Sequence, residues 1–264
     1  KGHEVRVYNR TAAKVAQWAG EFGGTACATP REASSGVEVA FTMVGDDDDV
    51  RAVITGADGA LAGLPAGGIL VDHTTASAEV AREMDAACTA AGRHFIDAPV
   101  SGGQAGAENG ALTIMCGGNE AAFATAQPVM QAYGKAVTLM GPAGAGQLTK
   151  MVNQICIAGL VQALSEAVNF ALKAGLDTDK VLATISKGAA QSWQMENRWK
   201  TMAEGKFDFG FAVDWMRKDL RITLQEARRN GAPLPVTALV DQFYRMVQQK
   251  GGARFDTSSL IINL

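Results

Sequence analysis

The sequence has little cysteine and little histidine, and neither is arranged to bind a metal. Only four of its 264 residues are cysteines and three are histidines. No C-x-x-C pair occurs, and no two histidines have the i, i+4 spacing that places two ligands on one helix face. The sequence therefore predicts neither a metal centre nor a disulfide framework, and its separate thiols indicate a reducing, cytoplasmic environment.

An excess of charge of one sign is absent as well. The chain has 24 basic and 27 acidic residues, a formal net charge of −3, so we expect no nucleic-acid partner. A hydrophobic fraction of 47% with 19% charged residues excludes a disordered chain and a bundle of membrane helices. Residues 1–11 contain no apolar run typical of a signal peptide. We therefore expect a soluble globular protein with no membrane partner.

Glycine, in contrast, is abundant, and its 30 residues favour tight turns between strands and helices. Up to about residue 141, short apolar runs alternate with alanine-rich helical patterns, which is typical of βα units and a mostly parallel sheet. The predicted strands are residues 5–8, 37–44, 68–74, 94–100, 112–118 and 136–141. The crossover helices are residues 11–23, with Thr11 as the N-cap, and residues 77–92.

The pattern changes near residue 144, after which only helices are predicted, at residues 147–174, 212–230 and 236–250. The first of these would be about 40 Å long. Its most apolar stretch is too short to span a bilayer, and polar residues interrupt the rest, so we expect the central helix of an all-helical domain. The predicted domains are residues 1–143 and residues 144–264.

The first predicted strand does not fit the first position of a nucleotide-binding sheet. In such a sheet the first strand is central, and a glycine loop follows it to hold the pyrophosphate. Residues 5–8 resemble the second strand, and a sheet without its central strand would leave buried backbone groups unpaired, at about 1–3 kcal/mol each. We therefore expect about 25–30 further residues upstream, and a chain without them should not fold stably.

Two clusters of residues suggest a binding site. Lys150, Asn153 and Gln154 have i, i+3 and i+4 spacing, so they share one face of the long helix, where burial is costly unless they have partners or a function. The alternative is a lysine that extends to water. After the strand at residues 94–100, Ser101, Gly102 and Gly103 could hold a small carboxylate with a hydroxyl and backbone N–H groups. The alternative there is an ordinary glycine turn.

Two other polar features have simpler explanations. Residues 46–49 are four consecutive aspartates that open a predicted helix, and the helix dipole explains them better than a cation site does. His73 lies near the end of the predicted strand at residues 68–74 and could carry a proton, but we favour a surface or turn histidine.

The segments VYNRT, DAPVSGGQAGAENGALTIMCGG, GAGQLTKMVNQ and MRKDL occur in this order along the chain. Together they resemble the β-hydroxyacid dehydrogenase family, which includes 3-hydroxyisobutyrate dehydrogenase, tartronate semialdehyde reductase and glyoxylate or succinic semialdehyde reductases. The resemblance covers essentially the whole chain. It implies an α/β fold in which a Rossmann-type, mostly parallel sheet domain is followed by an all-helical domain, with a long helix joining them. It also implies a homodimer or homotetramer.

The resemblance also implies roles for individual residues. Lys150 corresponds to the catalytic lysine of the family, and Gln154 stands where many members have a second asparagine. The residues implied to bind substrate are Ser101, Gly102, Gly103, Asn153 and Asp219. Those implied to bind the cofactor are Asn9, Arg10, Thr11, Met43, Val44, Thr75 and Lys218. At the position of Arg10 a basic residue favours the 2′-phosphate of NADP, so NADP is expected to be preferred over NAD.

The implied reaction is hydride transfer between NADP and a small β-hydroxy acid, or the matching semialdehyde, with Lys150 as general acid and base. A homologue that binds nucleotide without turnover is one alternative, although Lys150 argues against it. A related imine reductase or a sugar-acid phosphate dehydrogenase is another. Imine reductases usually replace the lysine, and phosphogluconate enzymes have a much longer helical domain, so both are less favoured. The acid itself and the direction of the reaction are not determined by the sequence.

Overall fold

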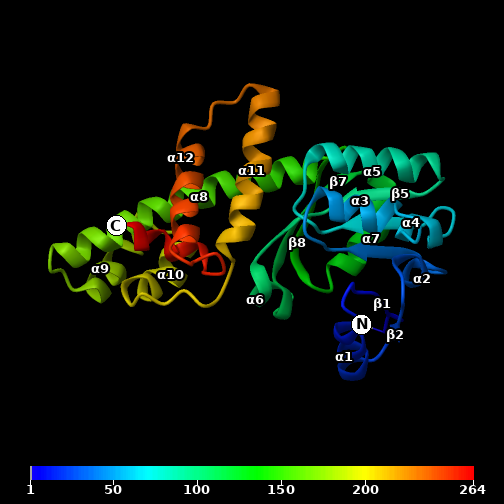
Figure 1. Cartoon of the computed structure of the whole chain (residues 1–264), viewed down its shortest axis with the longest axis horizontal. Coiled ribbons are helices and arrows are strands. Elements are labelled where there is room, and N and C mark those ends of the chain that lie inside the picture. Colours follow the sequence, from blue (N-terminus) through cyan, green and yellow to red (C-terminus); the bar gives the residue numbers. More distant parts are fainter. Residues whose placement is uncertain (1) are drawn as a thin grey trace. The chain divides into compact units, whose positions relative to one another are not determined.

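The computed structural model describes residues 2–264, and its internal contacts divide the chain into two compact units, residues 1–150 and residues 151–264. We call them the sheet unit and the helical unit and describe each by itself. Helix α8 (Ala145–Lys173) begins in the sheet unit and continues into the helical unit (Figure 1).

The sheet unit contains two sheets. The smaller is a parallel pair, β1 (Arg6–Val7) and β2 (Thr25–Ala26). The larger has six strands: β3 (Val39–Thr42), β4 (Ile69–Asp72), β5 (His94–Asp97), β6 (Val100–Ser101), β7 (Leu112–Gly118) and β8 (Gly134–Gly141). Strands β3, β4 and β5 are parallel neighbours, so their carboxyl ends meet at one edge. Strand β7 runs antiparallel to β5 and β6 and parallel to β8.

Seven helices of the sheet unit connect these strands: α1 (Ala12–Phe22), α2 (Pro30–Ser34), α3 (Asp47–Thr55), α4 (Ala60–Gly63), α5 (Ala78–Ala90), α6 (Gly103–Glu108) and α7 (Glu120–Met130). All four residues of β4 are buried, as expected for a strand that is covered on both faces. Buried side chains of α3, α4 and α5 form the core on one face, whereas those of α7 belong to the core on the other.

The helical unit is built around α8. Its other helices are α9 (Thr178–Ile185), α10 (Trp193–Ala203), α11 (Val213–Asn230), α12 (Pro235–Gln249) and the 3-10 helix η1 (Thr257–Asn263). Apolar residues of α8 pack against α11 and α12 in one cluster and against α10 in another. Helix α11 ends at Gly231, whose φ of 79° is the left-handed conformation that glycine adopts without strain.

Most of the predicted elements are present, with shorter strands. The β7 prediction matches the strand end for end, and the five longest predicted helices differ from the structure by one or two residues at most ends. Strands β2 and β6 were not predicted, because two residues are too few to show an alternating pattern. The predicted strand at residues 37–44 ends at Thr42, so Met43 and Val44 lie in the loop after it.

The sequence predicts that the apolar part of α8 is too short to cross a membrane. Judged by length and composition alone, this is wrong, because one 18-residue window of the helix is apolar enough to span a bilayer. About a third of this window is buried in the protein. The central helix of a soluble protein passes the same test, so this finding does not establish a membrane helix.

Candidate functional site

The loop between β1 and α1 carries Asn9, Arg10 and Thr11. The side chain of Asn9 accepts a hydrogen bond from the backbone N–H of Thr11 at 2.8 Å, which shapes the turn. Thr11 occupies the N-cap position of α1 as predicted, but its side chain makes no capping hydrogen bond. The guanidinium of Arg10 is 85% exposed and lies 3.1 Å from Asp49. An exposed ion pair of this kind is weak, so Arg10 is able to exchange its partner for a phosphate.

Side chains at the carboxyl ends of β3 and β4 fix the loop that contains Met43 and Val44. The hydroxyl of Thr74 donates to the buried carboxylate of Asp72 at 2.7 Å and accepts from the backbone N–H of Val44 at 2.9 Å. The hydroxyl of Thr42 donates to the same carboxylate oxygen at 2.8 Å. This network holds two strand-end loops together. Thr75 follows directly and is half-buried, whereas the side chain of Met43 is 70% exposed.

The prediction that His73 is a surface or turn histidine is wrong. The residue is only 8% exposed. Its Nδ1 lies 2.6 Å from the carbonyl oxygen of Ala98, and its Nε2 lies 2.7 Å from the hydroxyl of Tyr133. Burial lowers the pKa of His73, and the bond to Ala98 opposes that shift. The side chain is thus a neutral link between the end of β4 and the segment after β5.

Ser101, Gly102 and Gly103 lie where β6 passes into α6. Gly102 has a φ of 133° and Gly103 a φ of 62°, and both values are rarely adopted by residues with a side chain. Ser101 is half-buried and the two glycines are exposed, so backbone groups of this turn are accessible. Such a turn offers a hydroxyl and accessible backbone groups, and carboxylate binding there stays a prediction.

Asp97 and Gln147 attach the start of α8 to the strand ends. Both oxygens of the buried Asp97 carboxylate accept backbone N–H groups, from Gly144 just before α8 at 2.7 Å and from Gln147 in its first turn at 2.9 Å. A Cβ on Gly146 would clash with the carbonyl oxygen of Met115, so only glycine permits this close approach. The side chain of Gln147 accepts from the backbone N–H of Ala76 and donates to the carbonyl of Thr74. The first turn of α8 is therefore fixed to the β4 and β5 ends.

Lys150 follows Gln147 by three residues, so the two share one face of α8. Lys150 is 6% exposed, which agrees with the prediction of a buried lysine rather than one that extends to water. Gln147 lies three residues before Lys150, as Asn153 lies three residues after it. The i, i+3 pattern that predicts Asn153 therefore also points to Gln147, which was not predicted. The bonds of Asp97 and Gln147 set the position of this lysine along the helix start.

In the helical unit, four residues named in the sequence analysis as candidates for the site form a chain of contacts. The amide of Asn153 donates to Gln154 at 2.8 Å, and Gln154 donates to one carboxylate oxygen of Asp219 at 2.7 Å. The ammonium of Lys218 lies 3.1 Å from the other oxygen of Asp219. Gln154 and Asp219 are each 2% exposed. Gln154 therefore serves as a buried partner of Asp219 and links it to Asn153.

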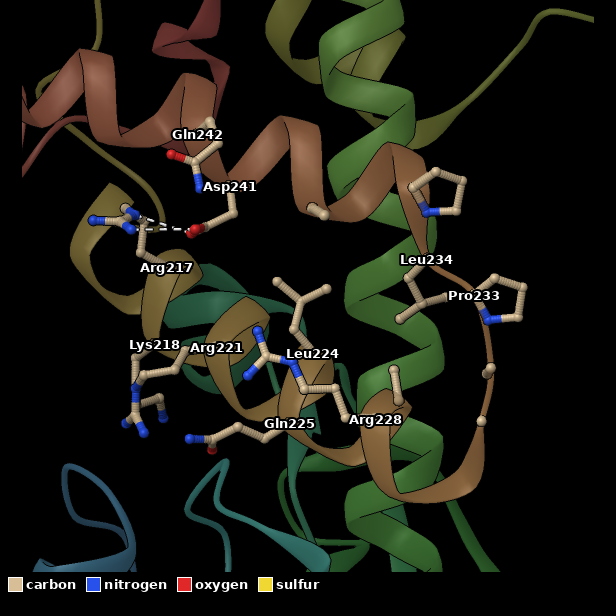
Figure 2. Close-up of a pocket in the computed structure, with 15 residues that line it drawn as sticks. Arg217, Lys218, Arg221, Leu224, Gln225, Arg228, Pro233, Leu234, Asp241 and Gln242 are labelled. Carbon is tan, nitrogen blue, oxygen red and sulfur yellow. Dashed lines mark hydrogen bonds and ion pairs between the residues drawn. The ribbon is translucent and has the colours of Figure 1, made fainter.

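Helices α11 and α12 form the walls of an open groove of about 930 Å³ in the helical unit (Figure 2). Arg217 pairs with Asp241 at 3.0 Å across it, while Lys218 and Arg221 extend from α11 to one side (Figure 2). Arg228 lies farther along the same helix. Asp241 is the only carboxylate among the lining residues, against four basic side chains, so the groove is cationic.

The structure therefore provides groups for anion binding and proton transfer. Within residues 2–264, no group of three or more His, Cys, Asp or Glu side chains could hold a metal ion. The aspartates at residues 46–49 begin α3, where Asp46 caps the helix, as the dipole argument predicts. Asp97, Asp72 and Thr74 were not identified from the sequence. Apart from the short contact between Asp72 and Thr74, their partners lie 30 or more residues away.

Two family descriptions match the chain. Residues 1–141 match the NAD-binding domain of 6-phosphogluconate dehydrogenase, and residues 144–264 match the NAD-binding domain of NADP-dependent 3-hydroxyisobutyrate dehydrogenase. An uncharacterized oxidoreductase of Shewanella frigidimarina is 62% identical over all of this chain and 91% of its own length. The 2-hydroxy-3-oxopropionate reductase of Escherichia coli is 34% identical over 98% of this chain and 88% of its own length.

A solved structure has the same fold over nearly the whole chain. The 3-hydroxyisobutyrate dehydrogenase of Mycobacterium tuberculosis, determined with L-serine, superposes with a TM-score of 0.89 at 28% identity. The match covers 99% of this chain and 91% of that one.

Proposed function

Because the chain belongs to the 3-hydroxyisobutyrate dehydrogenase-like family of β-hydroxyacid dehydrogenases, which are NAD(P)-dependent oxidoreductases, we propose that it interconverts a small β-hydroxy acid and its semialdehyde with NADP as the preferred cofactor. The observation that carries this proposal is Lys150, a buried lysine in the first turns of α8. Asp97 and Gln147 fix that part of the helix to the strand-end loops. A buried lysine in a fixed position can donate a proton to a carbonyl oxygen and, when neutral, remove it from the hydroxyl.

The residues of the sheet unit fit a dinucleotide. Arg10 and Asn9 at the β1 end are proposed to hold the ribose and its 2′-phosphate, and the exposed Arg10 side chain can exchange Asp49 for that phosphate. Met43, Val44 and Thr75 would line the cofactor at the β3 and β4 ends. Lys218, which lines the cationic groove, is proposed to bind the cofactor as well. NAD is the expected poorer alternative.

The substrate carboxylate is proposed to bind the Ser101, Gly102 and Gly103 turn, together with Asn153. The hydroxyl-bearing carbon is proposed to face Lys150, and positioning of this kind supplies a large part of catalysis. When bound, the nicotinamide supplies or accepts the hydride. In reduction, Lys150 Nζ donates a proton to the carbonyl oxygen as negative charge develops on it, and in oxidation the neutral amine removes the hydroxyl proton. Asp219, held by Gln154, is proposed to orient the substrate side of this site.

The test is a screen of the purified protein against 3-hydroxyisobutyrate, tartronate semialdehyde, succinic semialdehyde and glyoxylate, with NADP(H) and NAD(H) in parallel. We expect cofactor-dependent turnover of at least one, with kcat/KM higher for the phosphorylated cofactor. Turnover of imines but not of these acids would contradict the proposed substrate class. Tight cofactor binding without turnover of any compound would indicate a homologue that has lost catalysis.

A further inference from the structure

His73 connects three elements of the sheet unit that are distant in sequence. Its ring bonds to Ala98 after β5 and to Tyr133 before β8, and the Phe41 ring on β3 stacks against it with centroids 5.6 Å apart. The neighbours leave the imidazole only 8% exposed. The proposed reaction gives none of these four residues a role, although Ala98 lies three residues before Ser101.

The hydrogen-bond partners determine which nitrogen carries the proton. A carbonyl oxygen can only accept, so Nδ1 of His73 must donate to Ala98. The neutral ring then has a lone pair at Nε2, which accepts from the hydroxyl of Tyr133. Burial raises the pKa of Tyr133, so this hydroxyl keeps its proton. We call the arrangement of Tyr133, His73 and Ala98 the histidine clamp.

The clamp completes the hydrogen bonding of Ala98. The N–H of Ala98 donates to the carbonyl of Asp72 at 2.7 Å, and its carbonyl accepts from His73, so both polar groups of this buried residue are bonded to consecutive residues at the β4 end. Beyond Ala98, the carbonyl of Pro99 accepts from the backbone N–H of Met115, and Val100 of β6 pairs with Ile114 of β7. The path of the chain from Ala98 to Ser101 is thus held at every residue before the turn.

We propose that His73 is a positioning residue for the substrate turn at Ser101, Gly102 and Gly103. This inference rests on the proposed function of that turn. The imidazole affects the substrate turn only, because the loop with Met43 and Val44, which is proposed to line the cofactor, is held by other atoms. The backbone N–H of His73 donates to Thr42, and the Thr74 hydroxyl accepts from Val44. Both bonds remain when the imidazole is replaced.

Substitutions can separate this role from general stability. His73→Asn keeps an N–H near the position of Nδ1 and loses the acceptor for Tyr133, whereas His73→Leu removes both. We expect His73→Leu to raise the KM of the hydroxy acid at least about tenfold while the KM of the cofactor changes less than about threefold, since a buried carbonyl loses its donor. His73→Asn should stay within about threefold of wild type for both. The reciprocal control, Thr74→Val, should raise the KM of the cofactor more than that of the acid.

The tautomer supplies a test that does not depend on activity. The chain has three histidines, so a long-range ¹⁵N–¹H spectrum of histidine-labelled protein, compared with His73→Asn, identifies the His73 ring. We expect a neutral ring protonated at Nδ1, with the Nε2 signal shifted in Tyr133→Phe. A ring protonated at Nε2, or equal effects of His73→Leu on both KM values, would overturn the inference. If no hydroxy acid is turned over, the proposed function fails, whereas the tautomer still decides whether the clamp exists.

Discussion

Several candidate loops of the sheet unit are held by hydrogen bonds from side chains to the backbone, whereas the candidate residues of the helical unit are joined by bonds between side chains. In the sheet unit, the side chains of Asp97, Gln147, His73 and Thr74 bond to backbone groups of neighbouring loops. In the helical unit, side chains bond to side chains, from Asn153 through Gln154 to Asp219 and Lys218. The first arrangement fixes the course of the chain, and the second fixes the position of a charge. Substitutions should therefore affect the two units differently.

The largest effect on stability is expected in the sheet unit, from Asp97→Ala. This change removes the acceptor of two N–H groups at the start of α8 and leaves a cavity, so the free energy of unfolding should fall by about 2–4 kcal/mol. Urea unfolding measures this. The exposed Asp58 in the same unit gives a control, because Asp58→Ala should change stability by less than about 0.5 kcal/mol. Equal effects of the two changes would show that Asp97 does not anchor the helix.

Asp97 should also give the sheet unit a pH-dependent stability. Burial raises the pKa of its carboxyl from 3.8 to about 6, against the opposing effect of the two N–H groups. The folded protein therefore holds this proton to higher pH than the unfolded chain does. The contribution of Asp97 to stability should fall as the pH rises from about 4 to about 6, by at most about 3 kcal/mol.

Unfolding at a series of pH values, for the wild type and for Asp97→Asn, isolates this contribution from those of other carboxyl groups. The difference between the two curves should change with pH in that interval and become constant above it. Two parallel curves across the interval would contradict the raised pKa.

In the helical unit, Gln154→Met is expected to have the next largest effect. The change removes the amide that donates to Asp219 and leaves one oxygen of a buried carboxylate without that bond, which costs about 1–3 kcal/mol. A double-mutant cycle with Asp219→Asn should give a coupling energy of at least about 0.5 kcal/mol. Additive effects would mean that the two side chains do not depend on each other.

The smallest effect on stability is expected at Arg10, where the side chain is exposed. Arg10→Gln should change the free energy of unfolding by less than about 0.5 kcal/mol, because an exposed ion pair contributes little. The same change should reduce the preference for NADPH over NADH by about 10- to 100-fold, since it removes a charged contact to phosphate. The matched variant Asp49→Asn should keep that preference. An unchanged preference in Arg10→Gln would assign the phosphate to another residue.

The same difference between the units explains what could be predicted from the sequence. Lys150, Asn153 and Gln154 lie within five residues on one helix, so their shared face follows from helical periodicity, and the burial of Lys150 and Gln154 agrees with it. The contacts of Asp97 and His73 were not predictable in this way. Asp97 bonds to a backbone group 47 residues away, and His73 to a hydroxyl 60 residues away. No local pattern encodes such pairs.

The fold shows the same limit. Strand β7 and helices α5, α11 and α12 have periodic patterns and caps that locate them, whereas β2 and the short helices α2, α4 and α6 have too few residues for a period to be visible. Among the described residues, β1 pairs with β2 alone, and the six-stranded sheet is separate from them.

The decisive experiment is the turnover of Lys150→Ala, measured beside its affinity for NADPH. Lys135 is an exposed lysine in β8, so Lys135→Ala serves as the matched control. If Lys150 transfers the proton, kcat of Lys150→Ala should fall by about 10²- to 10⁴-fold while the dissociation constant for NADPH stays within about threefold of wild type. Near-normal turnover in Lys150→Ala would show that another group transfers the proton and would contradict the proposed mechanism.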